Sequence, residues 1–75
     1  MKLPALNAKK VIRVLKKAGF QELRQTGSHL VFANPQRTRL VVVPVHSGDL
    51  KKGLLFGIMK SAGLTQRQFV DFLSS

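Results

Sequence analysis

The pair Gly27-Ser28 limits the fold of this chain more than any other feature, because it predicts a tight reversal between two runs. Residues 20–26 and 29–34 flank the pair and are the candidate strands. A two-residue turn of the II′ type takes glycine at its first position, where φ is positive. The sequence therefore predicts a β-hairpin in which Thr26 faces His29.

The turn also assigns neighbours along the hairpin, because strand side chains alternate between the two faces of a sheet. Arg24 should face Val31, so that Arg24 and His29 share the outer face. The inner face should hold Leu23, Leu30, Phe32, Leu40 and Val42. The outer face should also expose Val31, Ala33, Val41 and Val43. An apolar patch of this kind is typical of a surface that a partner or a second copy covers.

A third strand is predicted over residues 39–44, after a longer turn over residues 34–38. It ends at Pro44, which cannot donate a ladder hydrogen bond. If this strand runs antiparallel to the second, its end lies near the start of the second strand. His46 would then converge with His29 at one rim of the sheet, with Lys51 and Lys52 close by in sequence.

Residues 8–18 are predicted to form the first helix. Asn7 is a suitable N-cap, and Gly19 is a suitable stop. Leu6 and Val11 have the spacing of a hydrophobic staple. One arc of the helix is apolar, and the opposite arc carries Lys9, Lys10, Arg13, Lys16 and Lys17. A solvated face is the simple interpretation of these cations, but cations without counter-charges repel one another and favour bound phosphate.

A second helix is predicted over residues 50–62, capped by Asp49 or Ser47 and stopped by Gly63. Leu54, Ile58 and Ala62 form its expected apolar arc. Thr65 and Gln68 have the spacing of a capping box, which predicts a short third helix. The predicted fold is one α+β domain over residues 1–75, of order α-β-β-β-α-α, with helices on one face of a three-stranded antiparallel sheet.

Charge narrows the class of partner. Lys and Arg number 13 against 3 Asp and Glu, which gives a formal net charge of +10. A small domain this basic usually meets a polyanion, most often nucleic acid. There is no cysteine, so no disulfide or thiolate metal site can form. No long apolar run and no signal-peptide core is visible, and we expect a cytoplasmic protein that does not enter a membrane.

Histidine can take or give a proton near neutral pH. RNA carries its own nucleophile, the 2′-hydroxyl, so a proton-transferring side chain and nearby cations suffice to cleave it without a metal. The carboxylates Glu22, Asp49 and Asp71 are widely spaced, which argues against a two-metal nuclease. A histidine beside a turn is, however, more often a surface residue than a catalyst. Residues alone indicate a basic domain that binds RNA or DNA.

The runs "KAGFQELRQTGSHLVF" and "VVVPVHSGDLKKGLLFGIMKSAGLT" resemble the HicA (YcfA-like) mRNA interferase toxins. The resemblance covers residues 11–72 and rests on "RQTGSH", "VPVH" and "LKKG" at their spacings. It implies a double-stranded-RNA-binding-domain-like fold, a toxin that cleaves mRNA without metal or other cofactor and halts translation, and an inhibiting HicB-like antitoxin in a hetero-oligomer. It implies that His29 is catalytic and that Gly27 and Ser28 belong to the same motif.

The roles of the remaining site residues are predicted from their expected positions in the fold. Arg24, Lys51, Lys52 and the first helix's cations are predicted to hold RNA phosphate, and His46 to be a second acid or base. Phe56 stands where the family usually has arginine, and it is expected to be half-exposed between Lys52 and Lys60. It could stack on a base, but we favour contact with the protein partner. Two alternatives are kept: a non-catalytic RNA-binding module of the same fold, and an interaction protein that acts only within its complex.

Overall fold

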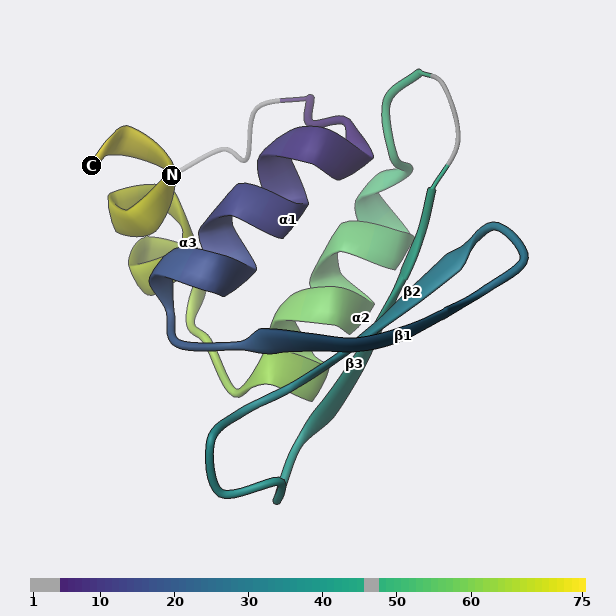
Figure 1. The fold of residues 1–75 in the computed structure, drawn as a ribbon. Coiled ribbons are helices and arrows are strands. Elements are labelled where there is room, and N and C mark those ends of the chain that lie inside the picture. Colours follow the sequence, from purple (N-terminus) through teal and green to yellow (C-terminus); the bar gives the residue numbers. More distant parts are fainter. Residues whose placement is uncertain (1–4, 46–47) are drawn as a thin grey trace.

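The computed structural model describes residues 5–45 and 48–75. The elements follow the predicted order: α1 (Ala8–Lys17), β1 (Gln21–Thr26), β2 (His29–Ala33), β3 (Leu40–Pro44), α2 (Lys52–Ala62) and α3 (Gln66–Ser74). The three strands form one antiparallel sheet in the order β1-β2-β3. The helices lie on one side of this sheet (Figure 1), so the predicted fold class is confirmed. No helix in the described part of the chain is long and apolar enough to cross a bilayer.

Local signals set the bounds of α1. The Asn7 side chain accepts a hydrogen bond from the Lys10 backbone N–H at 3.0 Å, which satisfies one of the free donors of the first turn. Leu6 and Val11, the predicted staple, are both buried. The helix ends at Lys17, one residue earlier than predicted, and Gly19 follows with φ of 98°.

The turn between β1 and β2 forms as predicted. Thr26 pairs with His29, so the loop contains only Gly27 and Ser28. Gly27 has φ of 58°, and Arg37 is the only described residue other than glycine with a positive φ. A positive φ at the first loop position and a negative one at the second is the pattern of a type II′ turn.

A β-bulge in β1 changes the predicted register beyond Arg24. Arg24 pairs with Val31 as expected, but Glu22, not Leu23, pairs with Phe32, and the register shifts between Glu22 and Arg24. Leu23 is therefore the extra residue of the bulge, and its side chain is 38% exposed rather than packed on the inner face. The prediction for Leu23 was wrong because alternation cannot reveal an inserted residue.

The faces predicted for β3 were reversed. Phe32 pairs with Val41 and Leu30 with Val43, so the two valines join these buried side chains beneath the helices. Leu40 and Val42, predicted to lie inside, are 58% and 48% exposed. The predicted exposed outer patch of Val31, Ala33, Val41 and Val43 was also wrong, because all four are buried. Leu40 and Val42 are the exposed apolar residues of the outer face.

The second helix starts later than predicted. Lys51 is its N-cap and makes no side-chain capping hydrogen bond. Asp49, a predicted cap, instead forms an isolated β-bridge with Asn7, and the Leu50 N–H donates to the Leu6 carbonyl at 2.7 Å. Ser47, the other predicted cap, lies outside the described residues.

Two further features complete the helical layer. Leu54 is 38% exposed, and the arc of α2 that packs on the core is Leu55, Ile58, Met59 and Ala62. The predicted place of Leu54 in that arc was therefore wrong. The Thr65–Gln68 capping box is present in full and begins α3, which packs against α1. Gly63 ends α2 as predicted, with φ of 72°.

Candidate active site

His29 is the first residue of β2 and is exposed. It is the central member of a row across the sheet, paired with Thr26 on one side and with Pro44 on the other. Leu30 and Phe32 point into the core, so His29 points to the opposite, outer face of the sheet. The Gly27-Ser28 turn therefore presents the imidazole at the end of the hairpin on a face that no described helix covers.

Arg24 lies on the same face as His29. It pairs with Val31, which is two residues from His29 along β2 and has the same orientation. The predicted sharing of one face by Arg24 and His29 is thus confirmed by the strand pairing. The arginine is exposed, and its five N–H donors are available on the surface beside the histidine.

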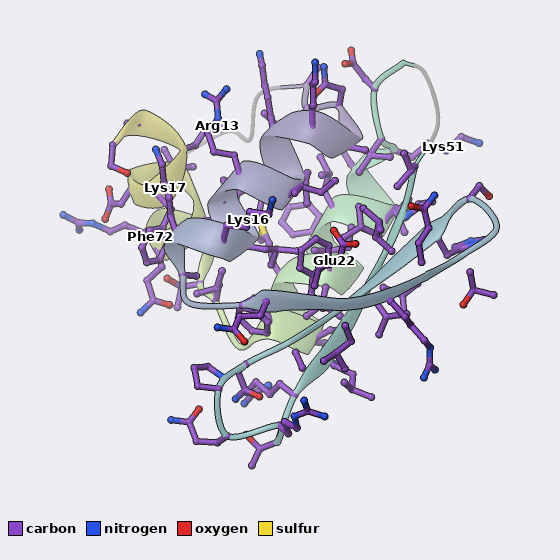
Figure 2. All side chains as sticks on the ribbon, viewed as in Figure 1. Arg13, Lys16, Lys17, Glu22, Lys51 and Phe72 are labelled. Atoms are coloured by element: carbon purple, nitrogen blue, oxygen red, sulfur yellow. The ribbon has the colours of Figure 1, made fainter. Side chains whose placement is uncertain are left out.

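The end of β3 reaches the turn directly. The backbone N–H of Val45 donates to the Ser28 carbonyl at 2.5 Å, so the chain is still hydrogen-bonded to the hairpin one residue before His46. His46 itself lies outside the described residues, and its convergence with His29 stays a prediction. Lys51 and Lys52 are both exposed at the start of α2. Figure 2 shows Lys51 on the side of the molecule toward which the hairpin projects.

The cations of α1 form a separate surface. All five predicted cations are exposed, while the helix buries Ala8, Val11, Val14 and Leu15. Arg13 points away from the sheet (Figure 2). Because α1 covers the inner face of the sheet and His29 lies on the outer face, the structure does not bring these cations together with His29. A flat ligand on one face cannot touch both groups.

Lys17 differs from the other cations of α1 because its ammonium group already has partners. It donates to the carbonyl of Phe72 at 3.3 Å and to the carbonyl of Ser75. These are oxygens at the C-terminal end of α3, where the helix dipole favours a positive charge. Lys17 and Phe72 lie together in Figure 2. Lys17 therefore ties α3 to α1, a role that local sequence patterns do not reveal.

The carboxylates are dispersed. Glu22 projects from β1 toward the helical side (Figure 2), Asp49 precedes α2, and Asp71 lies on α3. Within residues 5–45 and 48–75, no three His, Cys, Asp or Glu side chains gather as a candidate metal site. The described residues enclose no pocket, and His29 and Arg24 are both exposed on the surface.

Phe56 is 45% exposed on α2, in the position predicted between Lys52 and Lys60. Leu54, also exposed, lies on the other side of the buried arc, because residues two apart on a helix do not face each other.

Sequence reasoning missed one residue near the turn. The side-chain amide of Gln25 donates to the Gly27 carbonyl at 3.1 Å. The signal was present in "RQTGSH", where a long amide side chain stands two residues before the glycine. Together with the bond from Val45, this contact means that both carbonyls of the two-residue loop are occupied.

Comparison with known protein families gives one informative match. A family model described as HicA toxin of bacterial toxin-antitoxin matches residues 8–64 of the 75-residue chain. The matched region runs from the start of α1 to just past α2 and leaves out α3. Comparison with curated proteins gives no match.

Proposed function

Because the chain belongs to the HicA family of toxins of bacterial toxin–antitoxin systems, we propose that it is an mRNA interferase that needs no metal. Membership of this family supports a nuclease kind of activity. The finer proposal is an endoribonuclease that halts translation by cutting mRNA, with His29 as the catalytic residue. mRNA is met in the cytoplasm, and we place the toxin's action there.

The reaction uses the nucleophile within RNA. The 2′-hydroxyl loses its proton, and its oxygen attacks the adjoining phosphorus. The bond from phosphorus to the 5′-oxygen of the next nucleotide breaks, and that oxygen takes up a proton. The products are a 2′,3′-cyclic phosphate and a free 5′-hydroxyl. His29 is the general base for the first proton or the general acid for the second. His46 is proposed as the second acid or base on sequence grounds alone.

Arg24 is the proposed phosphate ligand nearest the chemistry, because it shares the outer face with His29. A guanidinium group matches the geometry of two phosphate oxygens. Lys51 and Lys52 are proposed to hold the strand at the rim. Lys9, Lys10, Arg13 and Lys16 supply affinity for more distant phosphates, on RNA that continues around the rim to the helical side. Lys17, which already holds α3, is the weakest candidate of this group.

An antitoxin of the HicB kind is the proposed partner. A chain with 13 basic and 3 acidic residues attracts an acidic protein. Phe56 on α2 is proposed to contact this partner, as are Leu40 and Val42 on the outer face, because they are large exposed apolar side chains. An antitoxin that covered the outer face would block His29 within a toxin–antitoxin hetero-oligomer.

One observation carries the proposal: in a chain of this family, a Gly-Ser turn presents an exposed histidine on the same face as an arginine. The test incubates purified protein with RNA in the presence of a chelator. We expect wild-type protein to cleave, and His29→Ala to lose about 10²- to 10⁴-fold in rate, the range for a general acid or base.

Thr26→Ala is the matched control, because Thr26 pairs directly with His29 and is also exposed. We expect it to cleave at nearly the wild-type rate. His29→Ala should also stop growth inhibition while antitoxin binding persists. Undiminished cleavage by His29→Ala would reject the catalytic assignment, and binding without cleavage by the wild type would favour the non-catalytic RNA-binding module.

A further inference from the structure

In the Gly27-Ser28 turn before His29, the carbonyl groups are hydrogen-bonded to described residues, but the Ser28 N–H is not. The Gly27 carbonyl accepts from the Gln25 side chain, and the Ser28 carbonyl accepts from the Val45 N–H. The Ser28 N–H, in contrast, donates to no group of the described residues. Within residues 5–45 and 48–75, this backbone donor beside His29 has no acceptor and is available to a ligand.

The position of Gln25 decides which way this donor points. Gln25 pairs with Leu30, which is buried beneath the helices, so its side chain leaves the strand on the inner side of the sheet. The hairpin projects past the helices (Figure 1), which is why Gln25 is nevertheless exposed. Since Gln25 binds the Gly27 carbonyl from this side, that carbonyl points inward.

The next group along the chain must then point outward. In a trans peptide the N–H is directed opposite to the preceding C=O, and none of the described peptide bonds is cis. The Ser28 N–H therefore points to the outer side, the side of His29 and Arg24. Hairpin turns of types I′ and II′ differ mainly by a flip of this central peptide. The Gln25 contact holds the Gly27–Ser28 peptide in the orientation that turns the Ser28 N–H toward His29.

We propose that the Ser28 backbone N–H donates to a non-bridging oxygen of the scissile phosphate, and that Gln25 is the positioning residue that aims it. This inference rests on the proposed function. A fixed backbone donor stabilises charge that develops on a phosphate oxygen without any reorganisation during the reaction. It would act from one side of the phosphate, while Arg24 and His29 act from the adjoining strands.

The kinetic test replaces Gln25 by Met, which has a similar length and no donor. Gln21→Met is the control, because Gln21 is exposed on the same strand and distant from the turn. We expect Gln25→Met to lower kcat about three- to tenfold, the value of one hydrogen bond, with KM changed less than twofold. Gln21→Met should match wild type. Equal kcat for both variants would overturn the inference.

A spectroscopic test works without turnover. An RNA oligonucleotide with 2′-O-methyl riboses cannot be cleaved and serves as the probe. We expect its binding to move the Ser28 amide proton downfield in wild type and Gln21→Met, and much less in Gln25→Met. An unmoved Ser28 amide in bound wild-type protein would overturn the inference, even where His29→Ala abolishes cleavage. Full cleavage by His29→Ala would instead overturn the proposed function, whatever the amide does.

Discussion

The outer face of the sheet and the exposed face of α1 carry different groups that the proposed RNA cleavage would use. The outer face holds His29 and Arg24 but is otherwise poor in charge and bears the apolar Leu40 and Val42. The face of α1 has cations only, with no side chain that transfers a proton near neutral pH. The comparison teaches that the proposed proton-transferring residue and the exposed cations of α1 lie on different faces of this fold. Each can be altered without the other, and the two should leave different marks on kinetics.

The largest effect that would sharpen this comparison comes from the α1 face. In the triple variant Lys9→Gln, Lys10→Gln and Arg13→Gln, three exposed charges are removed and no buried contact is lost. We expect RNA affinity to fall more than tenfold at low salt. The slope of log affinity against log salt should flatten by about two, because each of the three lost phosphate contacts contributes about 0.7 to the slope for single-stranded RNA. The single-turnover rate at saturating RNA should stay near wild type. A fall in that rate with an unchanged salt slope would show that the two faces are not separate.

The next prediction tests the two faces of β3 by unfolding. Val43 is fully buried and its neighbour Val42 is 48% exposed, so the same substitution by threonine probes both sides of one strand. We expect Val43→Thr to lower the free energy of unfolding by about 1–3 kcal/mol, because it buries a hydroxyl that lacks a partner. Val42→Thr should change it by less than about 0.5 kcal/mol. Denaturant titration measures both, and equal losses would contradict the observed register.

The smallest expected effect distinguishes two lysines of α1. Lys17→Gln removes the ammonium group that binds the end of α3, whereas Lys16→Gln removes an exposed charge with no such contact. We expect Lys17→Gln to destabilise the protein by about 0.3–1 kcal/mol and to leave RNA affinity nearly unchanged. Lys16→Gln should do the reverse. If Lys17→Gln weakened RNA binding as much as Lys16→Gln, Lys17 would belong with the other cations after all.

Features set by neighbouring residues could be predicted from sequence. The Asn7 cap, the Gly27-Ser28 turn and the Thr65–Gln68 capping box each depend on a few adjacent side chains, and all are present. The turn then placed His29 and Arg24 on one face correctly, because the pairing close to a two-residue loop leaves no freedom. This part of the candidate site was therefore predictable.

Features set by distant contacts could not be predicted. The run "LVVVP" is apolar at every position of β3, so alternation gives no sign of which side faces the core. The bulge at Leu23 has no local signature in "QELRQT". Leu54 and Leu55 are adjacent and chemically identical, and only packing decides that Leu55 is buried.

The bulge at Leu23 makes the two borders of the sheet unequal. A further strand that aligned with β1 would meet donors and acceptors out of step, whereas β3 keeps an unbroken register from Leu40 to Pro44. Growth of the sheet by an added strand is therefore favoured on one side only. The same asymmetry disfavours edge-to-edge association of copies into a continuous sheet. Each junction would need the free edge of β1, where the bulge disrupts strand pairing.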